Sequence, residues 1–426
     1  MTSLIRTGLI ASVVALCCTA SASAAPSSRG VNIIGIGQNP STAAISSELS
    51  KAKLAGANVV RTQIFWSALE PSATGGVDQT TLAALDALVA GANARGIKVL
   101  PIVDSAPCWA SDAPPEIKGD CSTPGQIAGA AGYGPSDPAR YGAITAMIAA
   151  RYGAKLAGIE IWNEPDQANE LHLKGPNKVA RYAAILKAAY PAIKAVSPTT
   201  KVLGGTFVGG NGKFLQALYD AGIKGYYDIL SVHFYDETLY SLRETRKVMK
   251  ANGDTKPVWL GEFGYSSCYP QHKSQGGLPC VSRRIQGRRI ADVFRGLRRA
   301  PYVQGAIVYQ LSDSQNYDMG LFDRNGKKKP SFAPVSSIFK HKKIPKPRKV
   351  SLKLRRAGSK VVATGSGPGG DFYEIRVWQS GQLRYLGIVK LSRNLTFKTA
   401  LPKALGTSGL TVKATYLSGG SATRRI

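Results

Sequence analysis

Short apolar runs alternate with amphipathic stretches along most of the chain. The runs predict strands at 31–36, 59–62, 97–103, 157–162, 201–206, 227–235, 257–263 and 305–310. The stretches between them predict helices at 41–56, 80–95, 137–152, 178–196, 213–221, 240–251 and 282–299. Eight strands alternating with helices favour a closed parallel (β/α)₈ barrel. An open doubly wound sheet is the alternative, but no glycine-rich phosphate loop follows the first strand.

The pattern changes after residue 340. Residues 341–349 are rich in lysine and proline, which is typical of a semi-rigid linker. Beyond them, apolar runs at 350–354, 360–364, 372–378, 386–391, 395–399 and 410–416 are separated by Gly/Ser turns and predict a small all-β sandwich. We therefore expect a barrel domain at 25–340, the linker at 341–349 and a sandwich domain at 350–426.

Residues 1–24 have the pattern of a secretory signal peptide. Arg6 supplies the positive charge, 9–16 is apolar, and Ala22-Ser23-Ala24 resembles a cleavage site. The apolar segment is too short to be a transmembrane anchor. Lipoprotein processing at Cys17 or Cys18 fits poorly, because no suitable small residue precedes either cysteine. We expect a monomer that is secreted, extracellular or associated with the cell wall.

Removal of this leader leaves four cysteines: Cys108, Cys121, Cys268 and Cys280. An even number in an oxidising compartment indicates two disulfides. Three pairings are conceivable, and we expect Cys108–Cys121 with Cys268–Cys280 because each closes a single loop. No Cys-x-x-Cys or neighbouring histidine favours zinc instead. We expect no metal and no cofactor.

Positive charge is concentrated near the end of the chain. The formal net charge is +29, and residues 341–426 hold 18 lysines and arginines against Asp371 and Glu374. A cationic domain on an exported protein would be attracted to anionic cell-wall polymer or to a membrane surface. Solubility and a generally basic proteome are the alternatives. Nucleic acid fits poorly, because the charge lies outside the cytoplasm and no helical recognition element accompanies it.

Two glutamates stand where predicted strands end. Ile159-Glu160-Ile161-Trp162 leads into Asn163-Glu164-Pro165, and Pro165 cannot extend a strand ladder. Trp259-Leu260-Gly261-Glu262-Phe263 ends the later strand. Two carboxylates at two strand tips are what glycoside hydrolysis requires. The alternative, that both only cap strands on a solvated rim, is disfavoured because barrels place catalysis at that face.

These motifs resemble the acid/base and nucleophile strands of clan A retaining glycoside hydrolases, of which families five and thirty-nine are the nearest types. The resemblance covers residues 31–340. It implies that Glu164 is the acid/base, that Glu262 is the nucleophile, and that Asn163 hydrogen-bonds the sugar 2-hydroxyl.

Other polar side chains also lie at predicted strand ends. Arg61 and the Tyr235 hydroxyl would keep Glu262 ionised. Glu164 must start protonated, so it needs a less polar setting, against Trp162 or Phe207. His233 would contact substrate or Glu164, with a structural hydrogen bond as the alternative.

Aromatic residues near strand ends are candidates for binding sugar rings. Trp66, Trp109 and Tyr265 follow such ends, although aromatic residues are as often part of the core. Clan members commonly carry tryptophan at the tip of strand eight, where this chain has Gln310 after Tyr309. Either Tyr309 takes that role, or Gln310 binds an unusual sugar such as a furanose.

The leading hypothesis is a secreted retaining β-glycosidase that acts on a polysaccharide or oligosaccharide. A carbohydrate- or cell-wall-binding protein without catalysis is one alternative, because a barrel scaffold can bind glycans without cleaving them. A transglycosylase is the other, because the same residues could pass the glycosyl unit to a second sugar.

Overall fold

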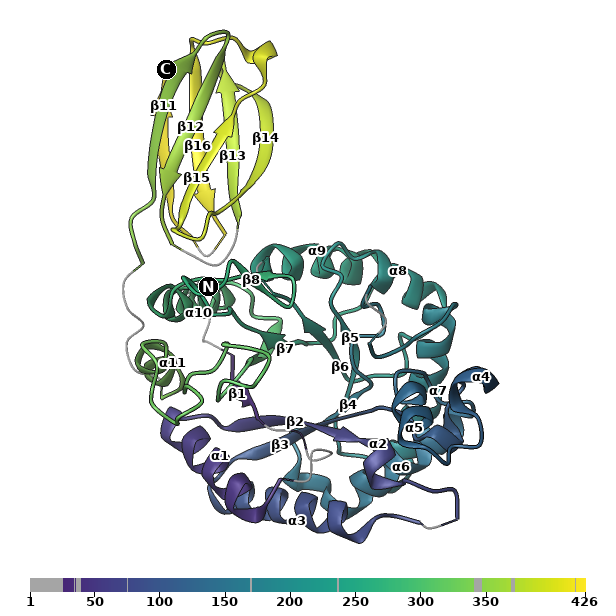
Figure 1. The fold of residues 1–426 in the computed structure, drawn as a ribbon. Helices are drawn as coiled ribbons and strands as arrows, with labels where there is room; N and C mark the ends of the chain where they lie inside the picture. The colour runs from purple at the N-terminus through teal and green to yellow at the C-terminus, as the bar shows by residue number, and fades with distance from the viewer. Residues whose placement is uncertain are drawn as a thin grey trace, which may run out of the picture.

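The computed structural model describes residues 26–426, apart from positions 34, 36–39, 75, 169–170, 236, 341–346, 369–371 and 418. The predicted signal peptide and residues 341–346 of the predicted linker lie outside the described residues. The described chain forms a barrel followed by a β-sandwich, which confirms the predicted fold class (Figure 1). Within this part of the chain, no helix is long and apolar enough to cross a membrane.

The described barrel strands are parallel and close in the order β1-β10-β7-β6-β5-β4-β3-β2. They are β1 (Ser28–Asn32), β2 (Val59–Phe65), β3 (Lys98–Asp104), β4 (Ile159–Ile161), β5 (Val202–Phe207), β6 (Ile229–His233), β7 (Val258–Phe263) and β10 (Val303–Val308).

Helices surround the strands as an outer ring (Figure 1). The longer ones are α1 (Thr42–Ala55), α3 (Gln79–Ala94), α6 (Pro138–Tyr152), α7 (Lys178–Val196), α8 (Lys213–Asp220), α9 (Thr238–Ala251), α10 (Arg283–Leu297) and α11 (Phe332–Phe339). Helix α1 shows how local sequence sets the bounds. The Ser41 hydroxyl accepts from the Ala44 N–H at its start, and Gly56, at φ 86°, ends it in the left-handed conformation that glycine tolerates.

Apolar side chains close the bottom of the barrel. Alternate residues of each strand point inward, so the amino-terminal layer consists of Val59, Leu100, Leu203, Ile229, Trp259 and Ile307. The indole of Trp259 fills space beside Gly305, where a Cβ would collide with the ring. Polar side chains occupy the layers above, and the functional site is therefore confined to the carboxyl-terminal half of the barrel.

Three barrel elements differ from the prediction. β1 lies at Ser28–Asn32 rather than 31–36, because the polar-looking Ser28-Arg29-Gly30 pairs with β10. β2 continues to Phe65, so Arg61 lies inside a strand and not at its tip. Helix α11 was not predicted; it packs its apolar face on the core through Val335 and Phe339.

The sandwich contains one sheet of order β11-β12-β15 and one of order β14-β13-β16-β17. Its strands are β11 (Ser351–Ala357), β12 (Lys360–Ser366), β13 (Phe372–Gln379), β14 (Gln382–Lys390), β15 (Thr396–Ala400), β16 (Leu410–Tyr416) and β17 (Ser421–Arg425). The predicted set lacked β17. β17 is an edge strand that pairs with β16 but buries few of its side chains. Its sequence is therefore polar and lacks the apolar pattern used to predict strands.

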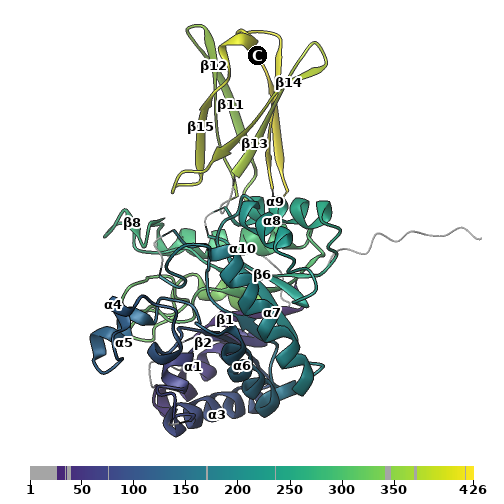
Figure 2. The same cartoon turned by 90° about the vertical axis from the view of Figure 1, so that its right-hand side faces the viewer.

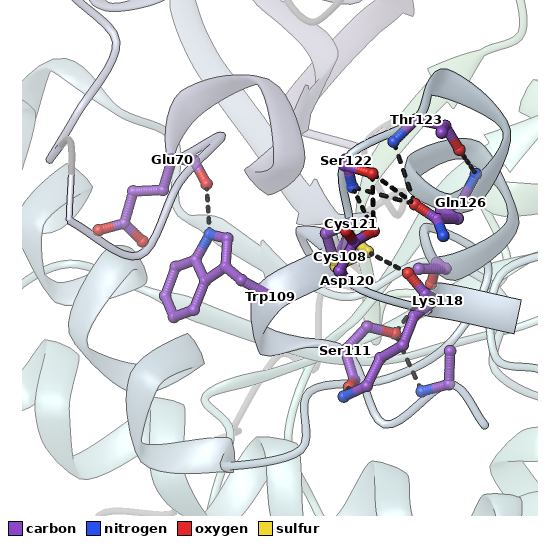
Figure 3. Close-up of a disulfide and its surroundings, with 12 residues drawn as sticks. Glu70, Cys108, Trp109, Ser111, Lys118, Asp120, Cys121, Ser122, Thr123 and Gln126 are labelled. Carbon is purple, nitrogen blue, oxygen red and sulfur yellow. Dashed lines mark hydrogen bonds between the residues drawn. A yellow bond between two sulfur atoms is a disulfide. The ribbon is translucent and has the colours of Figure 1, made fainter. Parts of the chain in front are cut away.

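Two long loops of the barrel carry the disulfides. Cys108 pairs with Cys121 and Cys268 with Cys280, as predicted. The first loop contains α4 (Pro115–Lys118) and α5 (Pro124–Ala130), and its disulfide lies beside these short helices (Figure 3). The second contains the hairpin of β8 (Ser274–Gln275) and β9 (Leu278–Pro279). The further short helix α2 (Trp66–Leu69) follows β2.

The sandwich packs against one side of the barrel (Figures 1 and 2). Arg243 of α9 lies 3.2 Å from Glu374 of β13, and the rings of Tyr240 and Phe372 meet edge to face at 5.4 Å. The turn between β14 and β15 contacts the second disulfide loop, where the Arg393 guanidinium lies 4.8 Å from the ring of Tyr269. The two domains are therefore in contact near the loop that carries β8.

Candidate active site

A cavity of about 580 Å³ opens at the carboxyl ends of the barrel strands. Its polar lining residues are Asn32, Arg61, Gln63, Asn163, Glu164, Gln167, His172, His233, Tyr235, Glu262, Tyr309, Asn316 and Tyr317. The loop of the second disulfide contributes Gly276 and Leu278. A concave site of this size with converging polar groups at this end of a barrel is the expected place for catalysis.

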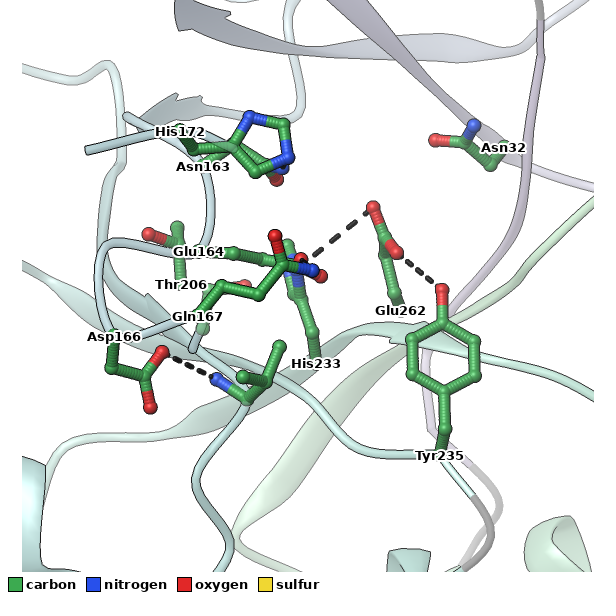
Figure 4. A network of polar contacts seen from close by, with 12 residues as sticks. Asn32, Asn163, Glu164, Asp166, Gln167, His172, Thr206, His233, Tyr235 and Glu262 are labelled. Carbon is green, nitrogen blue, oxygen red and sulfur yellow. Dashed lines mark hydrogen bonds and ion pairs between the residues drawn. The ribbon is translucent and has the colours of Figure 1, made fainter. Parts of the chain in front are cut away.

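The structure brings the two predicted catalytic carboxylates together. One oxygen of Glu164, one oxygen of Glu262 and a ring nitrogen of His233 all lie within 4.8 Å of one another (Figure 4). Both glutamates are over 90 % buried, with exposures of 7 % and 6 %. They face the same small volume from β4 and β7, on opposite sides of the barrel opening.

The backbone after β4 aims Glu164 into the cavity. Trp162 and Glu164 both have positive φ, 62° and 41°, which non-glycine residues rarely adopt. The N–H of Glu164 donates to the Thr206 carbonyl at 3.0 Å, and the Trp162 indole donates to the His172 carbonyl at 2.8 Å. These bonds hold the turn in its unusual conformation.

Each oxygen of Glu262 has its own hydrogen-bond donor. Nη1 of Arg61 lies 2.5 Å from Oε1, and the Tyr235 hydroxyl donates to Oε2. The predicted partners Arg61 and Tyr235 therefore both contact Glu262. Each oxygen accepts from a different donor, so the carboxylate of Glu262 is held in one orientation.

Glu164 lies in a polar setting, not the apolar one predicted from Trp162 and Phe207. Its Oε1 lies 3.1 Å from Nδ1 of His233, and its Oε2 accepts from Gln167 Nε2 at 2.6 Å. Burial favours the neutral acid, but the hydrogen bond and positive charge of His233 outweigh it and lower the pKa of Glu164. His233 thus contacts Glu164, which was one of the two expectations for it.

A third carboxylate, which sequence reasoning missed, lies beneath this pair. Glu160 of β4 is fully buried; Arg61 Nε lies 2.5 Å from its Oε2, and the Ser231 hydroxyl donates to its Oε1. Burial opposes its ionisation, but the charge of Arg61 and the hydrogen bond from His233 lower the pKa of Glu160 to about 2. Glu160 therefore binds Arg61 on the side away from the cavity and does not itself line the cavity.

The glycine before Glu262 makes room for this network. A Cβ at Gly261 would lie 2.6 Å from a Glu160 oxygen and would also meet Ser231 and His233. His233 itself is fully buried, with Nε2 3.4 Å from Glu160. Burial disfavours its charged form, but the negative charge of Glu262 and hydrogen bonds to Glu160 and Glu164 raise the pKa of His233 to about 9.

Asn163 is positioned from two sides. Its Oδ1 accepts from Arg61 Nη2 at 3.3 Å, and its Nδ2 lies 3.0 Å from Nε2 of His172. His172 had no signal in the sequence, because it stands in a loop with no strand before it. Burial opposes the charged form of His172, but Asp104, 3.5 Å from its Nδ1, and the negative charges of Glu164 and Glu262 together raise the pKa of His172. Asn163 thus presents an amide to the cavity in a fixed orientation.

Tyr309 and Gln310, the two candidates for the sugar contact at the end of β10, occupy different positions. Tyr309 lines the cavity, with its ring 6.1 Å from that of Tyr235 and 6.3 Å from that of Tyr317. Gln310 lies outside this lining: it donates to the Ser314 hydroxyl at 3.2 Å and borders an adjoining cavity that shares Tyr309. Of these two residues, Tyr309 is the one that lines the cavity with the two glutamates.

The structure corrects the assignment of Trp66 to substrate. Its side chain is fully buried, and its ring packs edge to face against Tyr141 at 5.8 Å and Trp109 at 6.2 Å. Neither Trp109 nor Tyr265 lines the cavity either; the Trp109 indole donates to the Glu70 carbonyl at 2.9 Å, as Figure 3 shows. Trp66 was assigned to the cavity because the predicted strand ended at residue 62, whereas β2 continues to Phe65 and places Trp66 in the core.

Solved structures share this architecture. They include a family 39 glycoside hydrolase from Bacteroides cellulosilyticus WH2 (16 % identity, TM-score 0.56), which covers 89 % of this chain and 80 % of that chain. The match to the GH39 enzyme from Xanthomonas axonopodis pv. citri (14 % identity, TM-score 0.57) covers 89 % of this chain and 93 % of that chain. The match to a GH39 β-xylosidase from Caulobacter crescentus (17 % identity, TM-score 0.56) covers 83 % of this chain and 84 % of that chain. At these identities the likeness establishes a common fold.

Comparison with family models identifies the family as well as the fold. No curated protein sequence matches the chain. The family model described as cellulase (glycosyl hydrolase family 5) matches residues 22–284, which is more than half of the chain and includes both candidate catalytic glutamates. The chain is therefore a glycosidase that belongs to the cellulase family, glycosyl hydrolase family 5.

Proposed function

We propose that the protein is a retaining β-glycosidase that cleaves a polysaccharide or oligosaccharide by double displacement. The observation that carries this proposal is the approach of Glu164 and Glu262 to within 4.8 Å. Retaining enzymes place their carboxyl groups about 5–5.5 Å apart, whereas inverting enzymes need about 6.5–9.5 Å to admit a water between them. The short separation supports direct attack by one carboxylate.

In the first step Glu262 attacks the anomeric carbon. A bond forms between that carbon and a carboxylate oxygen, while the glycosidic carbon–oxygen bond breaks and the leaving oxygen takes a proton from Glu164. Arg61 and Tyr235 hold the two oxygens of Glu262 in place before the attack. Because the nucleophile is already oriented, little reorganisation is needed during the reaction.

The proton for the leaving group is held by Glu164 and His233 together. His233 Nδ1 lies 3.1 Å from Glu164 Oε1, and the lowered pKa of Glu164 together with the raised pKa of His233 supports a proton on the histidine in the free enzyme. A sugar over the pair would exclude water, and the proton would then pass through Glu164 to the leaving oxygen. In the second step Glu164 removes a proton from water, which attacks the glycosyl-enzyme and releases Glu262.

Two further residues would bind the sugar at the cleavage point. Asn163, oriented by Arg61 and His172, is suited to hydrogen-bond the 2-hydroxyl. The Tyr309 ring, half-buried on the cavity wall, offers an apolar surface for the sugar. We also propose that the protein is exported and acts outside the cell or at the cell wall, because residues 1–24 have the pattern of a signal peptide.

The proposal is tested by reducing-sugar release from plant, fungal and bacterial wall β-glycans. Wild type should release sugar from at least one glycan, and Glu164→Gln and Glu262→Gln should each lose at least about a thousandfold of that rate. Glu116→Gln, at an exposed position of α4, is the matched control and should retain it. Full activity of Glu262→Gln would end the proposal, and binding without any release would favour the non-catalytic alternative.

A further inference from the structure

The outer face of sheet β11-β12-β15 is cationic and carries no acid. Leu352, Val361, Ala363 and Phe397 face the sandwich core, so the residues that alternate with them point outward. The charged residues on this outer face are Lys353, Arg355, Lys360 and Lys398. Among the described residues, none of the four has a hydrogen-bond or ion-pair partner for its side chain.

Strand register aligns these charges. Lys353 pairs with Thr364, which pairs in turn with Lys398, so two cations flank a hydroxyl in one row across the sheet. Arg355 lies two residues beyond Lys353 on the same face, and Lys360 lies diagonally opposite Arg355. Adjacent strands are about 4.8 Å apart. Lys353 and Lys398 are therefore about 10 Å apart across β12, and the positive charge gathered on this face would attract an anionic partner.

The sheet β11-β12-β15 lies on the side of the molecule to which the barrel opens. In Figure 2 the sheet β11-β12-β15 lies on the same side as the β8 hairpin, whose neighbours Gly276 and Leu278 line the catalytic cavity. In Figure 1 both lie toward the viewer. The turn between β14 and β15 fixes this placement, because the Ser392 carbonyl accepts from Arg289 at 3.3 Å and Arg393 covers Tyr269.

We propose that the outer face of sheet β11-β12-β15 binds an anionic polysaccharide and holds it beside the mouth of the catalytic cavity. Binding by this face stands on its own, whereas presentation of the chain for cleavage rests on the proposed glycosidase function. The four free cations would contact carboxylate, sulfate or phosphate groups along the polymer. The hydroxyls of Thr364 and Thr396, on the same face, would hydrogen-bond sugar hydroxyls.

The chemistry of the face favours a polysaccharide over a membrane. Stable membrane attachment combines cations with apolar side chains that enter the bilayer. The exposed large apolar residues of the sandwich, Leu383, Leu386 and Ile388, lie on β14 in the other sheet. That sheet also carries Glu374, which lies 2.5 Å from Arg376 and so compensates part of its charge. The cationic face of the first sheet has charge and hydroxyl groups, which suit a hydrated anionic polymer.

The test compares two polymers with one backbone. Binding of full-length Glu262→Gln chain to carboxymethyl-cellulose, which is anionic, and to hydroxyethyl-cellulose, which is neutral, would be measured by titration calorimetry. Lys353→Gln, Arg355→Gln and Lys398→Gln would be combined in this background. The matched control combines Lys98→Gln, Lys155→Gln and Lys201→Gln, which remove three exposed charges from the amino-terminal side of the barrel strands.

We expect the sandwich triple variant to weaken carboxymethyl-cellulose binding about tenfold, because it removes three of the four cations that we propose contact the polymer. The control triple should weaken it less than about threefold. Equal losses in the two triples would overturn the proposal, because binding would then follow net charge alone. So would tight binding of phosphatidylglycerol vesicles without binding of carboxymethyl-cellulose.

Measurements of folding and of glycan cleavage distinguish a failure of this binding proposal from a failure of the proposed glycosidase function. Thermal unfolding should show that the triple variants fold, and Lys398→Gln alone should give a smaller loss of binding in the same direction. In the active background, both triples should cleave short neutral oligosaccharides at the wild-type rate. If no glycan is cleaved but the binding difference persists, the glycosidase proposal fails and this surface stands. If cleavage occurs without the binding difference, this surface fails.

Discussion

Arg61 and Glu160 form an ion pair in the barrel interior, beneath the two candidate catalytic carboxylates. Nε of Arg61 lies 2.5 Å from Oε2 of Glu160, and their side chains are 3 % and 0 % exposed. Nη1 of the same guanidinium reaches Glu262. The orientation of the proposed nucleophile therefore depends on a carboxylate that does not line the cavity.

Loss of the Glu160 charge should weaken both folding and catalysis. Glu160→Gln keeps the shape but leaves the buried Arg61 with one carboxylate fewer, so we expect a loss of about 3 kcal/mol in the free energy of unfolding. Because Arg61 loses its anchor, kcat/KM should fall at least about tenfold. Denaturant unfolding and steady-state kinetics would measure both. Ser231→Ala, which removes a neutral donor from Glu160, should lose less in each; an unchanged kcat/KM in Glu160→Gln would contradict the positioning role.

Stability should depend on pH through His233. Its pKa rises to about 9 in the folded protein, against about 6.5 unfolded. Folding therefore gains stability that is complete below pH 6.5 and disappears as the pH rises through 9, with a total of about 3 kcal/mol. Thermal unfolding from pH 6 to 10 should show this loss in wild type and in His272→Gln, which changes an exposed histidine. His233→Gln should lack it, and an identical slope in that variant would refute the assignment.

Trp66 and Tyr309 should separate stability from substrate binding. Trp66 is buried in the core, so Trp66→Ala should cost about 3–5 kcal/mol of unfolding free energy. Tyr309 lines the cavity and is half-buried, so Tyr309→Ala should raise KM with a much smaller loss of stability. Unfolding curves and KM values on the same glycan would show the contrast. The reverse pattern would restore Trp66 as a sugar contact.

The two disulfides should differ in their effect on activity. They close loops with sequence separations of 13 and 12, so removal of either should cost about 3 kcal/mol if loop entropy dominates. Of the two loops, the one closed by Cys268–Cys280 lines the cavity, through Gly276 and Leu278. We expect Cys268→Ser with Cys280→Ser to raise KM, and Cys108→Ser with Cys121→Ser to leave KM unchanged. Equal KM values in the two double variants would contradict this difference.

The sequence predicted the barrel because its periodicity is strong where strands and helices alternate. It placed Glu164, Glu262, Asn163 and His233 at one end of the barrel, since each lies at or just after the end of an apolar strand. It did not place Arg61 well inside β2, because the predicted strand ended at residue 62, before the polar Gln63, although β2 continues to Phe65.

The remaining site residues carry weaker signals. Glu160 interrupts an apolar run in β4, as Arg61 does in β2. One charged residue of each sign inside two otherwise apolar strands could have indicated a buried ion pair between them. His172 and Gln167 stand in a loop whose path depends on tertiary packing, so spacing alone could not bring them to the cavity. Trp66 was misplaced for the opposite reason, because its apparent position at a strand end concealed a core contact.

The most direct test of the account is to trap the glycosyl-enzyme. Wild type, Glu262→Gln and Glu116→Gln would be incubated with a panel of 2-deoxy-2-fluoro-β-glycosyl fluorides and examined by intact-protein and peptide mass spectrometry. The account predicts that wild type and Glu116→Gln gain the mass of one fluorosugar on the peptide that contains Glu262, and that Glu262→Gln gains none. An adduct on another residue, or an adduct that persists in Glu262→Gln, would contradict it.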